Sequence, residues 1–190
     1  MTLVPNHIRN LLRYKAGKPI DEVKRELGLE KVIKLASNEN PLGPSLKAIK
    51  AIESSLKSIS LYPDSNGFYL REKLSEKFSL NIENVVLGAG SEGIMATIMR
   101  TFLNDSDHIL ATKNSFIGFR VLANASGKKI DWVPMREYAY DLNAMLDSIH
   151  DKTKIIYLAN PDNPTGTYFN KSMFDDFIKQ VPDRCLVILD

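Results

Sequence analysis

Lys154-Ile155-Ile156-Tyr157-Leu158 is an apolar run that leads directly into the loop Ala159-Asn160-Pro161-Asp162-Asn163-Pro164-Thr165-Gly166. The run has the length and composition of a buried β-strand. Proline fixes its own φ angle and restricts the residue before it, so two X-Pro bonds and a glycine make the loop rigid. A rigid loop directly after a strand indicates an asparagine held in one orientation, and an elaborate turn is the alternative.

The same rhythm of apolar strand and amphipathic helix extends on both sides of this stretch. It predicts a mainly parallel sheet with helices on both faces, a three-layer αβα arrangement. The loops that follow the strands should gather at one edge of the sheet, where ligands bind in such folds. The expected strands are 85–87, 108–111, 129–133, 154–158 and 185–189, and the expected helices are 91–103, 117–125, 142–149 and 171–181.

The front part of the chain has a different organisation. We expect residues 1–18 to be irregular, and Asn, Pro and Gly mark 38–44 as a loop. Helical spacing and end signals predict the remaining elements. These are helices at 19–27, 45–59 and 68–78 and a short strand at 32–35.

Composition excludes several classes of protein. The chain has 190 residues, of which 44% are hydrophobic and 25% charged, and its net charge is +2. The charges are interspersed, which argues against a nucleic-acid-binding surface. No apolar run reaches the roughly 20 residues of a membrane helix, and the N-terminus has no signal-peptide core. The single cysteine, Cys185, excludes an internal disulfide and is expected to be a small buried side chain. A reduced, cytoplasmic setting follows as the expectation.

Gly88-Ala89-Gly90-Ser91-Glu92-Gly93 lies between an expected strand and an expected helix. Glycines let the backbone approach a ligand, and the N–H groups at the start of a helix attract anions. The segment therefore indicates either a phosphate-binding turn or a tight turn in which Ser91 caps the helix. Its spacing matches neither the dinucleotide fingerprint nor a P-loop.

Asp190 follows the apolar run 185–189. A carboxylate at the end of a buried strand is costly unless it has a cationic or hydrogen-bonding partner. Asp190 is thus either a functional carboxylate or a solvated end of the chain.

Taken together, these motifs resemble the fold-type I pyridoxal-phosphate (PLP) aminotransferases. The rigid loop 160–166, a Gly-x-Gly-Ser turn before it and an aspartate after a later strand carry that resemblance. The front half resembles the histidinol-phosphate aminotransferase family more narrowly, through residues 9–19, 35–44 and 62–64. The resemblance implies a PLP-binding large domain at 45–190, preceded at 1–44 by an N-terminal arm and part of the small domain.

The resemblance also implies how the cofactor is held. Gly90, Ser91 and Glu92 match the turn that binds the PLP phosphate, and Phe116 matches the aromatic residue that stacks on the pyridine ring. Tyrosine is common at that stacking position, so a hydroxyl is absent here.

On the same resemblance, Asn163 matches the asparagine that hydrogen-bonds the phenolic oxygen of PLP, and Asp190 matches the catalytic aspartate that keeps the pyridine nitrogen protonated. Tyr62 matches a tyrosine that reaches the phosphate in the neighbouring subunit of a homodimer. Three further residues fall in segments that line the substrate pocket: Tyr14, Asn38 and Asn40.

The lysine that attaches PLP in this family has no match within the 190 residues, nor have the substrate-binding arginines. We therefore expect these 190 residues to be inactive alone and the chain to continue beyond Asp190. The expected reaction is amino transfer between L-histidinol phosphate and 2-oxoglutarate, in histidine biosynthesis. An aromatic or broad-range aminotransferase, a PLP-dependent decarboxylase, and a non-catalytic PLP-fold module stay open. His7, His108 and His150 have no metal-ligand spacing, so no metal site is expected.

Overall fold

The computed structural model describes residues 3–11 and 17–190. They form two compact units. The first unit contains the described residues of 1–14 together with 86–190, and the second contains those of 15–85. The expected division after residue 44 stays a prediction.

The second unit consists of helices and loops. Its helices are α2 (Ile20–Leu27), α3 (Leu46–Ser55) and α4 (Phe68–Phe78), with 3₁₀ turns at Leu56–Ser58 and Ile82–Asn84. Arg71 of α4 donates to the carbonyls of Val85 and Ile82 at 2.9 and 2.8 Å, which ties the helix to the turn that follows it.

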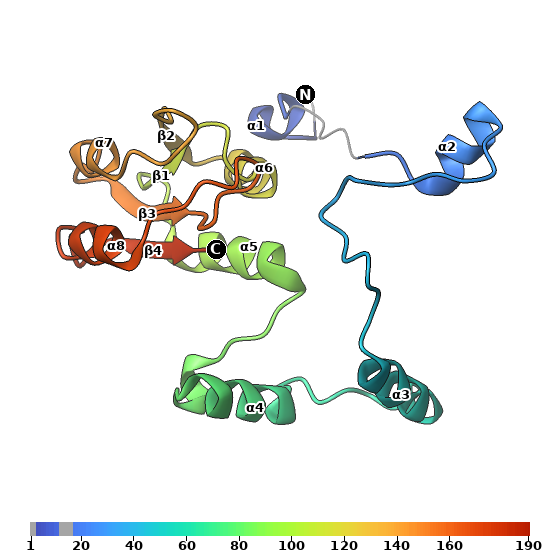
Figure 1. Ribbon diagram of the computed structural model, residues 1–190. Helices are drawn as coiled ribbons and strands as arrows, with labels where there is room; N and C mark the ends of the chain where they lie inside the picture. The colour runs from blue at the N-terminus through green and yellow to red at the C-terminus, as the bar shows by residue number, and fades with distance from the viewer. Residues whose placement is uncertain (1–2, 12–16) are drawn as a thin grey trace. The chain divides into compact units, whose positions relative to one another are not determined.

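The first unit is an α/β layer structure (Figure 1). Its strands are β1 (His108–Thr112), β2 (Lys129–Val133), β3 (Thr153–Leu158) and β4 (Leu186–Leu189), in the order β2-β1-β3-β4 and all parallel. Its helices are α1 (Asn6–Arg9), α5 (Gly90–Phe102), α6 (Ile117–Ala125), α7 (Leu142–Asp147) and α8 (Lys171–Ile178). The predicted α/β class with a parallel sheet is confirmed.

Alternation along the strands builds a core on each face of the sheet. On one face, Ile109 and Tyr157 pack with Met95 of α5 and Phe119 of α6. On the other face, Leu110 and Ile156 belong to a second cluster that includes Met145 of α7 and Phe177 of α8. The three expected layers are therefore present.

Three predictions about the elements are wrong. Residues 85–87 and 32–35 are not strands, and residues 6–9 of the expected irregular segment form α1. A strand needs a neighbour for its backbone N–H and C=O groups. Neither segment pairs with another within the described residues, and each exposes an apolar side chain to solvent, as at Leu35 (96%) and Val86 (72%).

Cys185 is half-buried, and its thiol donates to the Thr153 carbonyl at 3.1 Å. Burial raises the pKa of this thiol, which disfavours the reactive thiolate. In the described ranges, no helix is both long and apolar enough to span a membrane.

Candidate active site

The loop after β3 is organised around the side chain of Asp162, which is only 3% exposed. One carboxylate oxygen accepts from the Thr165 hydroxyl at 2.8 Å and from the Thr165 N–H at 3.2 Å. The other accepts from the Ser115 hydroxyl at 2.5 Å. Asp162 therefore joins its own loop to the loop that follows β1.

Asn160 fixes both ends of the same loop. Its side-chain amide exchanges two hydrogen bonds with the backbone of Phe169, at 3.1 and 3.0 Å. Its backbone N–H donates to the carbonyl of Asp190 at 3.0 Å. The loop that carries Asn163 is thereby attached to the end of β4.

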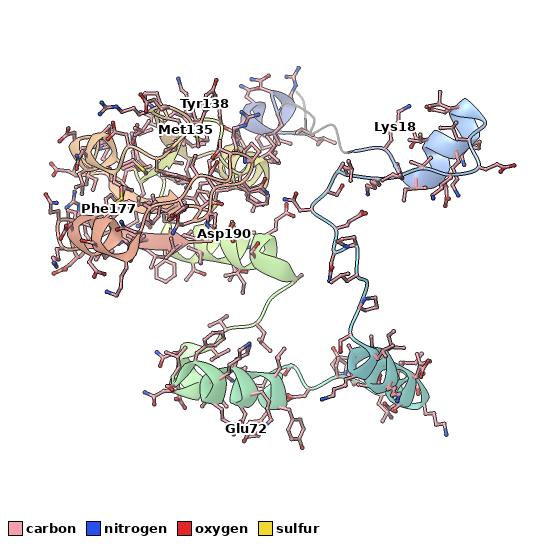
Figure 2. All side chains as sticks on the ribbon, viewed as in Figure 1. Lys18, Glu72, Met135, Tyr138, Phe177 and Asp190 are labelled. Atoms are coloured by element: carbon pink, nitrogen blue, oxygen red, sulfur yellow. The ribbon has the colours of Figure 1, made fainter. Side chains whose placement is uncertain are left out.

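Asp190 has a hydrogen-bonding partner in the core. The Tyr157 hydroxyl donates to Oδ2 of Asp190 at 2.9 Å. Burial, followed by the nearby carboxylate, raises the pKa of Tyr157, so this phenol stays protonated as a donor. The Tyr157 ring stacks on Phe119 with centroids 3.7 Å apart and planes within 8°. Figure 2 labels Asp190 at the end of β4. The sheet and the Tyr157 hydroxyl together position the carboxylate of Asp190.

A second buried phenol connects the loops. The Tyr140 hydroxyl accepts from the Ala159 N–H at 3.0 Å and lies 2.7 Å from the Ser115 hydroxyl. Burial is the main cause that raises the pKa of Tyr140 to about 12. Tyr140, Ser115 and Asp162 therefore form one continuous network beneath the carboxyl ends of β1 and β3.

Phe116 directly precedes α6 and packs against the core cluster that contains Phe119 and Tyr157. A Cβ atom on Gly118 would lie 2.6 Å from Cζ of Phe116, so Gly118 makes room for the ring. The aromatic side chain therefore lies across the first turn of α6.

The glycine turn leads into α5, which begins at Gly90 with φ = 69°. This left-handed conformation favours glycine. Ser91 lies inside the first turn and the helix has no side-chain cap, so the alternative that made Ser91 a helix cap is wrong. Ser91 and Glu92 are exposed. The Gly90 N–H donates to the Gly88 carbonyl at 2.9 Å, whereas the N–H groups of Ser91 and Glu92 have no acceptor among the described residues and are available to an anion.

Four further predicted residues belong to other parts of the chain. Tyr62, Asn38 and Asn40 belong to the second unit, and Tyr14 lies outside the described residues. Tyr62 is 96% exposed. The Asn40 side chain stabilises its own turn, accepting from the Leu42 N–H at 3.0 Å and donating to the Gly43 carbonyl at 3.2 Å.

The structure thus brings three predicted residues to one edge of the sheet: Phe116, Asn163 and Asp190 follow β1, β3 and β4. Ser91 lies in the first turn of α5, the helix that packs on the same face, although among the described residues no hydrogen bond joins it to the other three. Sequence reasoning missed four residues that hold this edge together, namely Ser115, Tyr140, Tyr157 and Asp162. Two of them are tyrosines in apolar surroundings, where a hydroxyl must find a partner, and that was the available signal.

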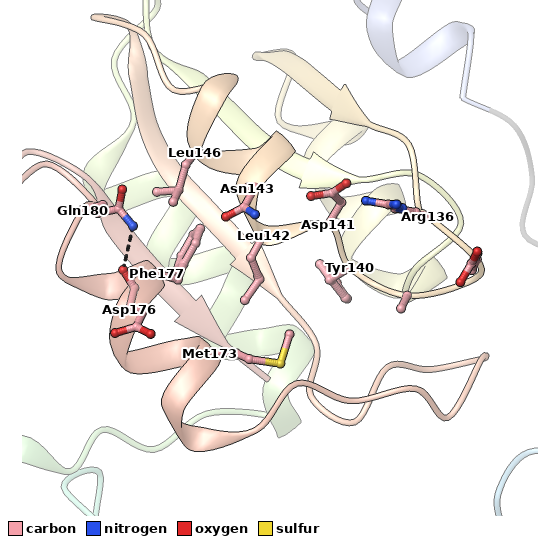
Figure 3. A pocket seen from close by; sticks show the side chains of 12 residues that line it. Arg136, Tyr140, Asp141, Leu142, Asn143, Leu146, Met173, Asp176, Phe177 and Gln180 are labelled. Carbon is pink, nitrogen blue, oxygen red and sulfur yellow. Dashed lines mark hydrogen bonds between the residues drawn. The ribbon is translucent and has the colours of Figure 1, made fainter.

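A separate cavity of about 410 Å³ lies between α7 and α8 (Figure 3). Leu142, Leu146, Met173 and Phe177 line it. It lies on the sheet face opposite to Phe116 and Tyr157 and shares only Tyr140 with the network described above. We therefore do not assign the candidate site to this cavity.

Comparison with known proteins identifies the family. A family model described as aminotransferase class I and II matches residues 30–190. Histidinol-phosphate aminotransferase 2 of Pasteurella multocida is 43% identical over 190 residues, all of this chain and 52% of the relative. Histidinol-phosphate aminotransferase 1 of Idiomarina loihiensis is 40% identical over the same share of both chains. The chain thus spans about half the length of these curated relatives.

Solved structures agree in fold. The histidinol-phosphate aminotransferase of Sinorhizobium meliloti, solved with pyridoxal-5'-phosphate, matches all of this chain and 51% of its own, with a TM-score of 0.87 at 21% identity. The corresponding enzyme of Clostridium acetobutylicum matches 81% of this chain and 45% of its own, with a TM-score of 0.71 at 26% identity. The described residues have this partial fold, and the matched family model covers most of the sequence: the chain belongs to the aminotransferase class I and II family.

Proposed function

We propose that the whole protein is a PLP-dependent aminotransferase that transfers the amino group of L-histidinol phosphate to 2-oxoglutarate. Family membership supports the reaction class, and the 40–43% identity to histidinol-phosphate aminotransferases supports the substrate. The structural observation that carries the proposal is the carboxylate of Asp190, held at the end of β4 by the Tyr157 hydroxyl.

The residues present fit the cofactor chemically. The N–H groups of Ser91 and Glu92 in the first turn of α5 suit a phosphate, and the ring of Phe116 offers an aromatic face. The Tyr157 hydroxyl donates to Oδ2 of Asp190, while Oδ1 accepts no hydrogen bond from the described residues. That oxygen suits a protonated ring nitrogen.

When bound, PLP supplies an electron sink for the negative charge that develops on the substrate carbon. In our proposal Asp190 holds a proton on the ring nitrogen, Asn163 donates to the phenolic oxygen, and Gly90, Ser91 and Glu92 hold the phosphate. Tyr157 keeps Asp190 in place, and the Tyr140–Ser115–Asp162 network keeps the loop of Asn163 in place.

Tyr62, Tyr14, Asn38 and Asn40 complete the proposed site in the whole protein. Tyr62 would reach the cofactor phosphate of the neighbouring subunit in a homodimer, and its full exposure leaves the hydroxyl available. Tyr14, Asn38 and Asn40 would line the substrate pocket.

The test uses the full-length protein with PLP. We expect turnover of L-histidinol phosphate, and Asp190→Asn should lower kcat by roughly a hundredfold or more, because it removes a preorganised charge interaction. Asn163→Ala should shift the visible absorption of the bound cofactor and weaken its binding. The matched control Asn143→Ala changes an exposed asparagine outside the site and should alter neither property.

Faster turnover of aromatic amino acids would contradict the proposed substrate, and PLP binding without any transamination would favour a non-catalytic module. We also propose that residues 1–190 alone do not transaminate, since none of them matches the lysine that attaches the cofactor. Turnover by purified residues 1–190 with added PLP would contradict this.

A further inference from the structure

Two histidines and an aspartate meet at the edge of the sheet opposite to the candidate active site. His108 is the first residue of β1, Asp131 lies within β2, and His150 lies in the turn before β3. The candidate active site follows the carboxyl ends of β1, β3 and β4, whereas His108 begins β1, His150 precedes β3 and Asp131 is the third residue of β2.

The three side chains converge on one carboxylate oxygen. Nδ1 of His108 and Nε2 of His150 each lie 2.9 Å from Oδ2 of Asp131. The imidazole rings are edge to face, with centroids 4.8 Å apart and planes at 90°. One ligand atom from each residue lies within 4.8 Å of the other two.

The backbone around the cluster is fixed by hydrogen bonds. The His108 N–H donates to the Lys152 carbonyl at 2.8 Å, and the His150 carbonyl accepts from the Thr153 N–H at 2.8 Å. Arg184 donates to the same His150 carbonyl at 2.9 Å. Side-chain rotation is therefore the main freedom left to the three groups.

We propose that His108, Asp131 and His150 bind one divalent transition-metal ion of the Zn²⁺ type. Two imidazole nitrogens and a carboxylate oxygen are ligands that Zn²⁺ takes at about 2.0–2.2 Å. Mg²⁺ and Ca²⁺ prefer oxygen ligands alone and are not expected here. The side chains of Asp131 and His150 are 33% and 42% exposed, which leaves an open side where water completes the coordination.

Ion binding requires two small rearrangements. A metal between the ligands replaces the hydrogen bonds to Asp131, so the carboxylate must move back slightly. The Lys152 N–H donates to Nδ1 of His150 at 3.2 Å, which places the ring proton on Nε2. Coordination at Nε2 requires the ring proton to lie on Nδ1 instead, so Nδ1 can no longer accept the Lys152 N–H. The loss of this bond should make the affinity lower than that of a closed four-ligand site.

The experiment titrates the full chain, purified without a polyhistidine tag and stripped with a chelator, with Zn²⁺ in a calorimeter. We expect one ion per chain. Asp131→Asn and His150→Ala should each weaken binding by about tenfold or more, since even outer-shell changes at metal sites cost that much. The controls are His7→Ala, which removes the third histidine of the chain, and Asp183→Asn, an exposed aspartate. Both should bind like the parent.

A second measurement guards against variants that fold poorly. Zn²⁺ binding to the folded state should raise the thermal midpoint of the parent and of the controls, and the increase should disappear with excess chelator. His150 is exposed enough for its variant to fold, so an equal increase in His150→Ala would overturn the proposal. The proposal would also be overturned if the parent bound Zn²⁺ no more tightly than Asp131→Asn does. These results are independent of transamination.

Discussion

Tyr157 donates its hydroxyl hydrogen to Oδ2 of Asp190 at 2.9 Å, across the neighbouring parallel strands β3 and β4. The register pairs Leu158 with Leu189, which brings the phenol and the carboxylate to the same edge of the sheet. The interaction therefore depends on the sheet, and it positions the residue that we propose to be catalytic.

Replacing Tyr157 with phenylalanine should lower the free energy of unfolding by about 1.5–3 kcal/mol, the usual contribution of a hydrogen bond to a charged group. Phenylalanine keeps the ring that stacks on Phe119 but removes one hydrogen bond to a charged group. Urea denaturation of the variant measures the effect. The control Tyr168→Phe changes a tyrosine that is 74% exposed and should leave the free energy unchanged. Equal stability of the two variants would show that the Tyr157 hydroxyl contributes nothing.

Stability should fall at alkaline pH because of Tyr140. Its pKa is raised from 10.0 to about 12, so the folded state keeps a proton that the unfolded chain loses. The contribution is fully present below pH 10, and it is lost as pH rises from 10 through 12. Over these two pH units the loss of stability approaches about 3 kcal/mol.

Denaturation across that pH range measures this loss. Tyr140→Phe should be less stable at neutral pH and should show a shallower alkaline decline than the parent. Tyr157 contributes in the same direction because its pKa is also raised, so the decline should not vanish entirely. An unchanged slope in Tyr140→Phe would exclude Tyr140 as a source of the dependence.

Periodicity predicted the elements of the sheet well. The expected bounds of α6 and β2 agree with the structure, because Ile117–Ala125 and Lys129–Val133 each have an apolar pattern with a clear period. The segment 85–87 looked equally apolar but is not a strand. Local sequence indicates a tendency to extend, whereas a strand also requires a partner whose position the local sequence does not contain.

The sequence could predict individual site residues but not the contacts between them. Asn163 and Asp190 stand out because of the loop and strand that precede them. The bond from Ser115 to Asp162 joins residues 47 positions apart, and the histidine cluster joins β1, β2 and the turn before β3. Such contacts depend on strand order and register, which periodicity alone does not determine.

The stability of helix α8 should depend on its N-cap residue, Asn170. The Asn170 side chain accepts from the Met173 N–H at 3.0 Å. Asn170→Ala leaves that N–H without this acceptor and should lower the free energy of unfolding by about 1 kcal/mol. Asn143→Ala is the control, because it places alanine at an exposed position inside α7 and should be neutral or slightly stabilising. Chemical denaturation compares the two, and a loss of equal size in both would contradict the role of the cap.

Asp162 should be the most sensitive polar residue of the candidate site. Asp162→Asn replaces one acceptor oxygen with an NH2 group, which must face either the Ser115 hydroxyl or the Thr165 N–H and cannot accept a hydrogen bond from it. Because the Ser115 hydroxyl can rotate to limit the loss, the expected cost is that of one buried donor left unpaired, about 1–3 kcal/mol. Asp162→Ala removes every acceptor at once and should cost more.

Urea denaturation measures whether Asp162→Ala loses more stability than Asp162→Asn, with Asp183→Asn as a control at an exposed aspartate. Proteolysis adds a local measurement, because the loop 160–166 depends on Asp162 for its attachment to Ser115 and Tyr140. We expect cleavage in this loop to accelerate in Asp162→Asn and to remain slow in the control. Suppose that Asp162→Asn and Asp162→Ala both resisted proteolysis like the parent. The hydrogen bonds of Asn160 with Phe169 and Asp190 would then be sufficient to hold the loop, and Asp162 would not be its organising residue.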